Sequence, residues 1–247
     1  MNALTVCVDY DDLLQITLPY NCRYFDKIVI VTSPKDTATF DFALSRSNVE
    51  VLATDTFYKD GASFAKGLAI EEGLDHLGRD GWICIVDADV IIPEDVLVTC
   101  PQVGYLYTPH RYLLEDPRKW SPDLDWKSLP TVRESEHAGY CQFFHADDPV
   151  LKDARPWYGT RWKHAAGCDS DFQAHWDKDH KIRLPWKVLH IGPHGLNWHG
   201  RFTPKLDGST PPNANACREA QERMYRRRSA EGGYPDEWFN EELCTDD

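Results

Sequence analysis

The chain has 247 residues, of which 42% are hydrophobic and 27% are charged. These values are ordinary for a globular protein, and the length suits one α/β unit with a full core better than two. Forty acidic residues against 27 basic ones give a net charge of −13. This charge disfavours general attraction to nucleic acid, because proteins that bind polyanions non-specifically are usually basic. No run approaches the roughly 18 apolar residues of a membrane span.

The eight cysteines are scattered along the chain, and none of them forms a C-x-x-C pair. Cys7 and Cys84 lie inside apolar runs. The opening segment 1–10 lacks the basic stretch followed by an apolar stretch that is typical of a secretory signal. We therefore expect reduced, partly buried cysteines and a cytoplasmic protein, in the host cytoplasm if the gene is viral.

The first hundred residues alternate short apolar, β-branched runs with helix signals. Residues 62–77 place apolar side chains on one helical face and predict a helix. The apolar runs predict strands over 4–8, 27–31, 49–52 and 82–86. Strands that alternate with helices indicate the α/β class, with a mostly parallel central sheet flanked by helices.

The second half is less regular. Residues 109–136, rich in Pro, Trp, Asp and Arg, predict a long loop or lid. Strands are predicted over 139–145 and 186–191, a short helix over 169–178, and a C-terminal helix over 215–230. Because no repeat or linker interrupts the chain, we predict a single domain.

Polar side chains follow each of the four strands predicted in the first hundred residues. Ligands of largely parallel sheets bind where the carboxyl ends of the strands meet their loops. The loops there carry Asp9, Thr32, Ser33, Asp55, Asp87 and Asp89. The sequence therefore predicts one polar, mostly acidic site at this edge of the sheet.

Five D-x-D pairs occur in the chain, but one differs in context. Asp87 and Asp89 alone directly follow a fully apolar strand and precede another apolar stretch. Carboxylates at the end of a buried strand are costly unless they are neutralised, and alternate residues of an extended segment point the same way. Because hard divalent cations take carboxylate oxygens, we predict that this pair binds Mn²⁺ or Mg²⁺. The alternative is a turn with two solvated aspartates.

The segments FAKGLAIEEGL and WICIVDADVIIPED resemble the core of GT-A glycosyltransferases of the family 2-like kind. A looser likeness continues through GYCQFFHA, AGCDSDF and LHIGPHGLNWHGR. The resemblance implies a single GT-A (Rossmann-like) domain over 1–247, which binds a nucleotide-sugar, a UDP-sugar, with residues 1–100 and the acceptor with residues 101–247. It also implies that Asp87 and Asp89 bind the metal that bridges the two phosphates of the donor.

The resemblance assigns the rest of the donor to the strand ends and to the helix before the D-x-D pair. The implied donor-binding residues are Val8, Asp9, Tyr10, Thr32, Ser33, Asp55, Lys66, Asp87 and Ala88. Asn197, Trp198 and Arg201 are expected to contact the donor or its phosphates. The alternative for Lys66 is a solvated charge on a helix.

GT-A enzymes often take a further metal ligand from a histidine late in the chain. His190 ends an apolar strand and is the first choice, His194 is the second, and His199 is an alternative that faces substrate. An imidazole ligand favours manganese over magnesium. The alternative for each is an ordinary loop histidine.

Asp169 and Asp171 open the predicted helix 169–178. The family often has an E-D pair in this region, whose Asp is the general base of inverting enzymes, but here Cys168 stands in place of the Glu. We predict Asp169 as the base that takes the proton of the acceptor hydroxyl, with Asp171 as the next candidate. The alternative for Asp169 is a helix cap or a hydrogen bond to the acceptor.

The acceptor is indicated only indirectly. A basic cluster consists of Arg218, Arg223, Arg226, Arg227 and Arg228. It is either a solvated helix face, paired with neighbouring glutamates, or a contact for a polyanionic acceptor. The chain also resembles phage-type glycosyltransferases that modify hydroxymethylated pyrimidines, which implies DNA as an acceptor.

Two other activities use similar residues. A nucleotidyltransferase acting on sugar phosphates shares the α/β layout, but it usually has a Gly-rich basic loop after the first strand, whereas VDYDDLLQ is acidic. A zinc hydrolase would use His190, His194 and His199 if they lay on a helix. Glycine and proline between these histidines argue against that helix.

Overall fold

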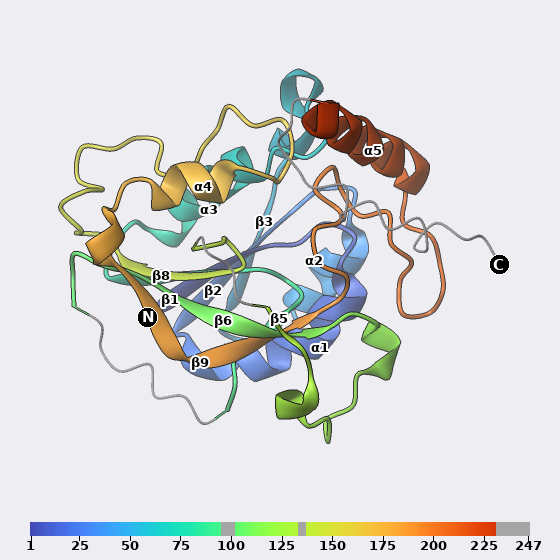
Figure 1. Cartoon of the computed structure of the whole chain (residues 1–247), viewed down its shortest axis with the longest axis horizontal. Coiled ribbons are helices and arrows are strands. Elements are labelled where there is room, and N and C mark those ends of the chain that lie inside the picture. Colours follow the sequence, from blue (N-terminus) through green and yellow to red (C-terminus); the bar gives the residue numbers. More distant parts are fainter. Residues whose placement is uncertain (95–101, 133–136, 231–247) are drawn as a thin grey trace.

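A computed structural model describes residues 1–94, 102–132 and 137–230 of the chain. In these residues nine strands form one sheet, in the order β3-β2-β1-β4-β8-β6-β9-β5, with β7 beside β6 (Figure 1). The strands are β1 (Asn2–Val6), β2 (Lys27–Thr32), β3 (Val49–Ala53), β4 (Trp82–Val86), β5 (Val90–Ile91), β6 (Leu106–Leu114), β7 (Thr131–Val132), β8 (Cys141–His145) and β9 (Lys181–Ile191). The α-helices are α1 (Asp11–Asn21), α2 (Thr37–Ala43), α3 (Lys66–Leu77), α4 (Cys168–Gln173) and α5 (Ala214–Ala230). The predicted α/β class is confirmed.

Half of the sheet is parallel throughout. Strands β3, β2, β1 and β4 all run in the same direction, and β6 and β9 form a second parallel pair. Antiparallel β8 joins these two groups, and the short β5 pairs antiparallel with β9. The carboxyl ends of β1 and β4 therefore meet at one edge, which is the edge at which β5 holds the end of β9.

Both faces of the sheet are buried. Neighbouring residues of β1 point to opposite sides, so Leu4 lies in a cluster with Leu74 of α3, whereas Ala3 lies in another with Leu14 of α1. Helices α3 and α4 cover one face, and α1 and α2 cover the other (Figure 1). Strands covered on both faces need apolar side chains at every position, which explains their continuous apolar runs.

Helix α3 packs very closely on the parallel strands. A side-chain carbon on Gly73 would lie 2.4 Å from Leu4 Cδ1 and 2.6 Å from Val31 Cγ2. Only glycine fits this approach without displacing the strands. The close packing fixes the start of α3, where Lys66 stands, relative to the ends of the strands.

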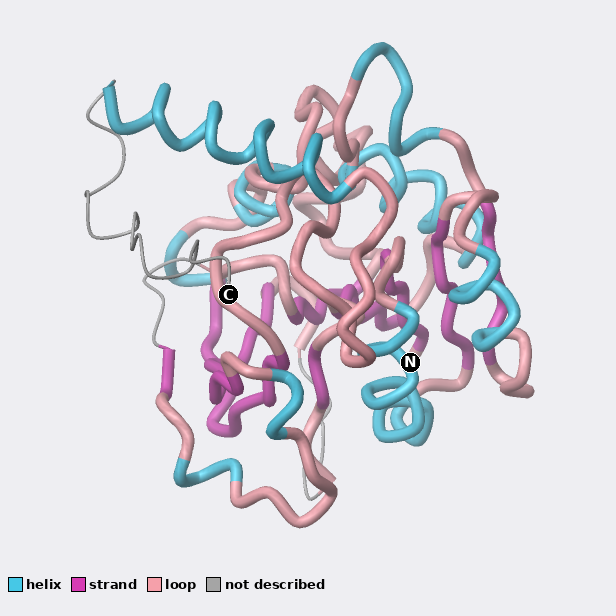
Figure 2. The backbone as a smooth tube through the Cα atoms, turned by 90° about the vertical axis from the view of Figure 1, so that its right-hand side faces the viewer, coloured by secondary structure: helices cyan, strands magenta, loops and turns pink. Residues whose placement is uncertain are grey.

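Helix α5 is placed differently from the other helices. Figure 2 shows it as the long helix at the top, lying over loops and away from the strands. The loops beneath it include residues 195–198, since Gln221 of α5 donates to the carbonyl of Gly195 (3.0 Å) and accepts from the amide of Trp198 (2.8 Å). Helix α5 thus covers a loop region.

The prediction of a loop over 109–136 was wrong for its first part. Strand β6 includes residues up to Leu114 and lies between β8 and β9. Pro109 stands where the register with β9 shifts between Thr108 and His110, so its missing N–H interrupts no regular ladder. Two short 3-10 turns, Pro117–Lys119 and Trp126–Ser128, follow β6, and residues 133–136 are outside the described part.

The other predicted elements appear with shifted ends. Strand β9 begins at Lys181, five residues before the predicted start at 186, and α4 ends at Gln173, before the predicted 178. Helices α1 and α2 were not predicted. The six described cysteines are free, as expected, and Cys100 and Cys244 fall outside the described residues. No helix in the described ranges is long and apolar enough to span a bilayer.

Candidate active site

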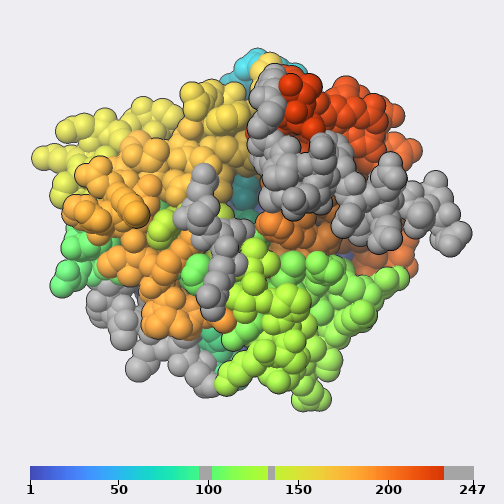
Figure 3. Space-filling model, in the orientation of Figure 1, coloured from blue at the N-terminus to red at the C-terminus, as the bar shows by residue number. Residues whose placement is uncertain are grey.

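A cavity of about 1260 Å³, called the main cavity below, lies at the carboxyl ends of β1 and β4. Figure 3 shows the surface hollowed between the yellow-orange and the orange-red parts of the chain. Most predicted site residues line this cavity: Val8, Tyr10, Lys66, Asp87, Ala88, Asp89, Asp169, His190, His194, Asn197, Trp198 and Arg201. Residues more than a hundred positions apart are thus brought to one place.

Five predicted site residues are not in the wall of the main cavity. Thr32 and Ser33 are buried, and Ser33 Oγ accepts a bond from the amide of Lys35 (3.3 Å). Asp55 borders a separate pocket of about 450 Å³. Asp9 and Asp171 have local roles described below. A contact of Thr32, Ser33 or Asp55 with a nucleotide stays a prediction.

The two aspartates of the D-x-D pair lie in the short connection between β4 and β5. The amide of Asp87 donates to the carbonyl of Tyr140 (3.0 Å), and the amide of Ile191 donates to the carbonyl of Asp89 (2.8 Å). The backbone on both sides is therefore fixed by β8 and β9. The two side chains are 27% and 16% exposed, so neither is fully solvated.

His190 stands beside Asp89 because of strand pairing. Residue His190 of β9 is opposite Val90 of β5, and its Nε2 lies 3.5 Å from Asp89 Oδ2. Burial raises the pKa of the Asp89 carboxyl, but His190 outweighs burial, and the pKa lies below its ordinary value. Within the described residues, Asp89 Oδ1 and His190 Nδ1 are buried without a hydrogen-bond partner.

Lys66 is the direct partner of Asp87. It is the first residue of α3, and its Nζ lies 2.6 Å from Asp87 Oδ1. Burial lowers the pKa of Lys66, but Asp87 more than offsets it, and the amino group stays charged. Burial raises the pKa of Asp87 above its ordinary value, with Lys66 opposing the rise. The prediction that Lys66 faces nucleotide or phosphate is untested, and the alternative of a solvated helix charge is wrong.

The three late histidines do not all lie in one place. His194 lines the main cavity, whereas His199 Nδ1 lies 2.6 Å from Ser63 Oγ, outside its wall. Burial lowers the pKa of His199 to about 4. In the part of the chain that the structure covers, no three His, Cys, Asp or Glu residues are grouped to hold a metal ion. Asp89 and His190 could hold a divalent cation only if water or a bound ligand supplies its other ligands.

Asp169 projects into the main cavity from the first turn of α4. Its Oδ2 accepts a bond from the amide of Gly139 (2.8 Å), and a side chain on Gly139 would lie 2.5 Å from Asp169 Cβ. The helix is capped by Gly167, whose φ is 108°, and not by a side chain. The alternative interpretation of Asp169 as a cap is therefore wrong.

Asp171, the second candidate for the base, is held by neighbouring side chains. Its carboxylate accepts bonds from Arg161 Nη2 (2.7 Å) and from Trp162 Nε1 (2.8 Å). It is not in the wall of the main cavity. The geometry therefore places Asp169, and not Asp171, where a substrate could reach it.

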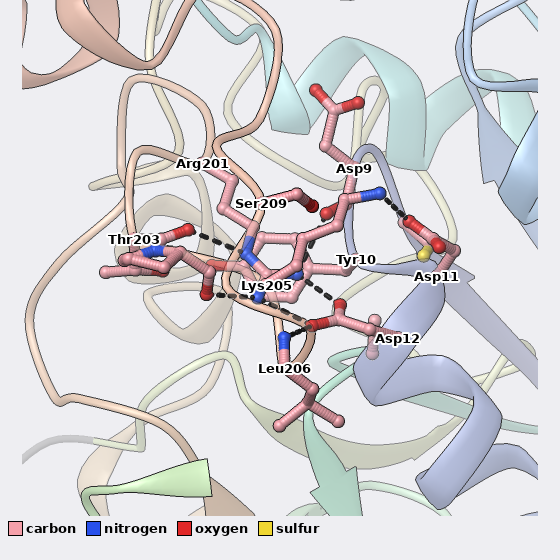
Figure 4. A network of polar contacts seen from close by, with 12 residues as sticks. Asp9, Tyr10, Asp11, Asp12, Arg201, Thr203, Lys205, Leu206 and Ser209 are labelled. Atoms are coloured by element: carbon pink, nitrogen blue, oxygen red, sulfur yellow. Dashed lines mark hydrogen bonds and ion pairs between the residues drawn. The ribbon is translucent and has the colours of Figure 1, made fainter. Parts of the chain in front are cut away.

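Two cations of loop 192–213 are bound to the first turn of α1, an arrangement called the 201–205 clamp below (Figure 4). Arg201 pairs with Asp12 (Nη2–Oδ2 2.9 Å) and donates to the carbonyl of Asp9 (2.9 Å), while Lys205 pairs with Asp11. Arg201 is 3% exposed. Its guanidinium bonds are directed inside the protein, and contact with a donor phosphate stays a prediction.

Asn197 holds the same loop. Its φ is 64°, its Nδ2 donates to the hydroxyl of Tyr10 (2.7 Å), and its Oδ1 accepts from the amide of Phe202 (2.9 Å). Asparagine tolerates this left-handed conformation better than most residues. Tyr10 and Asn197 thus join the two sides of the main cavity, and donor binding by Asn197 and Trp198 is untested.

Sequence reasoning missed some residues of the cavity wall. Arg111 is buried on β6, with its guanidinium 4.5 Å from the centre of the Tyr140 ring. Both line the main cavity. Arg111 was overlooked because its segment was predicted as a loop. Apolar and aromatic residues at both ends of 106–114 were the signal that favours a strand.

Comparisons with known proteins identify no family. No family model matches the chain, and no curated protein sequence matches it. Solved structures of similar layout include an inositol-1-phosphate CTP transferase from T. maritima (TM-score 0.49, 10% identity, 79% of this chain and 91% of that chain). Others are 4-diphosphocytidyl-2C-methyl-D-erythritolsynthase from Anaerococcus prevotii (0.45, 10%, 91% and 95%) and the glycosyltransferase GlyE from Streptococcus pneumoniae (0.42, 11%, 74% and 44%). At such TM-scores these likenesses assign no activity.

The 201–205 clamp predicts a large effect of Arg201 on stability. Arg201→Ala leaves the half-buried Asp12 with the Leu206 amide but without its guanidinium partner, and we expect a loss of about 3 kcal/mol in the free energy of unfolding. Arg118→Ala is the control, because Arg118 is 76% exposed and solvent screening leaves its pair with Asp116 weak. Urea unfolding measures both, and equal losses in the two variants would contradict a structural role for the clamp.

The environment of Asp9 predicts that the stability of the protein depends on pH. It follows β1 with φ at 61°, and burial together with Asp36 raises its pKa to about 6. In Figure 4 its carboxylate points away from the 201–205 clamp. Because the folded-state pKa exceeds the ordinary value of 3.8, the folded protein binds more protons than the unfolded chain between pH 3.8 and about 6. Stability should therefore fall as the pH rises through this window.

We expect Asp9→Asn to be more stable than the wild type above pH 6 by on the order of 1 kcal/mol, a value reduced for partial solvent screening. The difference should vanish below about pH 4, where Asp9 is protonated in both states. Asp60→Asn is a matched control, since Asp60 is exposed and also has a left-handed backbone (φ 51°). Urea unfolding from pH 4 to 7 decides, and the same pH profile in both variants would refute the role of Asp9.

Proposed function

We propose that the chain is a metal-dependent glycosyltransferase that moves a sugar from a UDP-sugar to an acceptor hydroxyl with inversion. The observation that carries this proposal is the pairing of β5 with β9, which sets His190 beside Asp89. At that place Asp89 keeps one buried oxygen without a partner among the described residues. Such an oxygen is costly to bury, and a divalent cation would satisfy it.

The donor set fits Mn²⁺ or Mg²⁺ together with a diphosphate. Mg²⁺ is usually bound through one or two carboxylates plus substrate phosphates and water, and imidazole also suits transition-metal ions. Two protein ligands, Asp89 and His190, are therefore enough if the donor supplies phosphate oxygens. When bound, the cation neutralises negative charge that develops on a nucleoside diphosphate leaving group.

Lys66 sets the charge of this site. Its contact of 2.6 Å with Asp87 balances one of the two carboxylates and leaves Asp89, beside His190, as the carboxylate that faces the cation. Asp87 is held in place by the same contact and by its backbone bond to Tyr140. We assign Asp87 to the donor ribose or to the metal, and Lys66 to the positioning of Asp87.

Asp169 is proposed as the general base. The Gly139 amide holds its Oδ2, and the carboxylate can take the proton of an acceptor hydroxyl as the hydroxyl oxygen attacks the sugar. The role needs a carboxylate in the same cavity as the donor site, and Asp169 meets that condition. DNA with modified pyrimidines as the acceptor stays a prediction.

The two alternative activities lack comparable support. The zinc hydrolase would need three histidines together, whereas His199 is turned to Ser63. The nucleotidyltransferase would need donors for a triphosphate at the loop after β1, where the nearby Arg201 and Lys205 are bound to Asp12 and Asp11. The measurements below separate the glycosyltransferase from the nucleotidyltransferase.

The metal role predicts metal-dependent donor binding. In a thermal-shift screen of nucleotide-sugars, we expect one UDP-sugar at a hundred times its Kd to raise Tm by about 5–10 °C. This shift should appear only when MnCl₂ is present. Asp89→Asn should lose this shift, because the variant loses a charged metal ligand. Asp123→Asn, in an exposed D-x-D pair, should keep it. Metal-independent stabilisation by a nucleoside triphosphate would favour the nucleotidyltransferase, and an unchanged response of Asp89→Asn would refute the metal site.

The base assignment predicts a separation of binding from turnover. Asp169→Asn should keep the metal-dependent thermal shift but lower the rate of UDP release by about 10²–10⁴-fold, as expected for loss of a general base. Asp171→Asn should release UDP at close to the wild-type rate, because Arg161 and Trp162 hold Asp171 outside the cavity wall. The opposite order of the two variants would transfer the role to Asp171.

A further inference from the structure

The wall of the main cavity differs in charge from the rest of the protein. Eight lysine and arginine side chains line it against six aspartates and glutamates, all within the described residues. In the whole chain, 27 basic residues face 40 acidic ones. The cavity is therefore locally basic in an acidic protein, and this sign favours an anionic ligand.

Several of these cations are already neutralised. Lys66 is paired with Asp87, and the two cations of the 201–205 clamp are paired with the start of α1. Arg218 and Arg226 on α5 differ from them. Arg218 has no ion pair with any residue that the structure describes, and its guanidinium lies 5.8 Å from the centre of the Phe202 ring. Arg226 lies 3.4 Å from Glu222, but both are largely exposed, so this pair is weak.

The arrangement on α5 is specific to one face. Arg218, Glu222 and Arg226 recur at a spacing of four residues and share the helix face that lines the main cavity. Arg223 and Arg227 lie outside the cavity wall, and Arg223 pairs with Glu219 (3.5 Å). A general solubilising role would not need this separation between the two faces.

The size of the cavity leaves room for a second substrate. Its volume of about 1260 Å³ exceeds the roughly 300–1,000 Å³ of a pocket for one small ligand. If the donor occupies the region of Asp87 and Asp89, the α5 wall is left for the acceptor. Arginine binds phosphate oxygens through two parallel N–H donors, which makes phosphate the best-matched anionic group.

We propose that Arg218 and Arg226 of α5 bind the phosphate group of a small phosphorylated acceptor. The proposal rests on the proposed function and names its acceptor class. A small molecule is favoured over nucleic acid because the chain carries a net charge of −13, which repels a long polyanion, whereas the cations are confined to the wall of one cavity. Asp169 lines the same cavity, so a hydroxyl of such an acceptor and the base lie in one cavity.

The test uses inorganic pyrophosphate as the probe, with EDTA present so that no metal at Asp89 contributes to binding. Isothermal titration compares the wild type with the double variant R218Q/R226Q. The matched control is R223Q/R227Q, which removes the same charge from the same helix outside the cavity. We expect the Kd to rise about tenfold or more in R218Q/R226Q, because charge-assisted bonds to phosphate are lost, and to change little in the control.

Donor binding is followed separately, as the thermal shift with UDP-sugar and MnCl₂. We expect this shift to be the same in the wild type and in both double variants. Absence of this shift in the wild type would refute the proposed function. The pyrophosphate titrations do not depend on the donor and report only on Arg218 and Arg226. If the Kd for pyrophosphate rose equally in both double variants, the change in net charge alone would explain the effect, and the proposal would be overturned.

Two further outcomes would also overturn it. Loss of the donor shift in R218Q/R226Q would assign the two arginines to the donor. The second outcome combines two results for the wild type at 150 mM salt, roughly physiological ionic strength: it does not bind pyrophosphate, but it binds a single-stranded oligonucleotide. If R218Q/R226Q lost that oligonucleotide binding, nucleic acid would replace the small acceptor.

Discussion

The antiparallel pairing of β5 with β9 is the contact on which the candidate site depends. It joins two residues of β5 to the end of β9, and in doing so it places His190 against Asp89. The same pairing fixes the backbone of Asp89 through the amide of Ile191. A carboxylate at the end of a buried strand is costly alone, and a strand from the second half of the chain supplies the neighbour that makes it tolerable.

The charges around the main cavity follow a consistent arrangement. Lys66 balances Asp87, and Arg201 and Lys205 balance the aspartates that begin α1. These pairs are largely shielded from water, where an unpaired charge would be expensive. Two places in the cavity wall differ from these pairs: Asp89 has only His190 beside it among the described residues, and Arg218 and Arg226 of α5 are exposed, which suits two ligands of different character.

The sequence predicts best what depends on local pattern. Continuous apolar runs predict the four parallel strands, because strands covered on both faces need apolar residues throughout, and their ends locate Asp87 and Asp89. His190 was the first choice among the late histidines because it ends an apolar strand, and the structure places it beside Asp89. The metal and donor roles of these residues remain proposals.

Features that depend on distant partners could not be predicted. Nothing near Arg201 in the sequence indicates that Asp12, 189 residues earlier, receives its guanidinium. Strand β6 was missed because Pro109 argues against a central strand unless the register shift beside it is known. The alternative interpretation of Asp169 as a cap failed because Gly167 can adopt the left-handed conformation that begins α4, and the local sequence does not reveal it.

The 201–205 clamp has a consequence for synthesis of the protein. Proteins emerge from the ribosome with their N-terminal residues first, so β1 to β4 can associate while the second half is still being made. The first turn of α1 carries two adjacent aspartates whose partners, Arg201 and Lys205, are translated much later. Until then those carboxylates stay hydrated, and the main cavity lacks the part of its wall that residues 192–205 supply. The nascent chain can therefore form part of its sheet before the wall of the main cavity is complete.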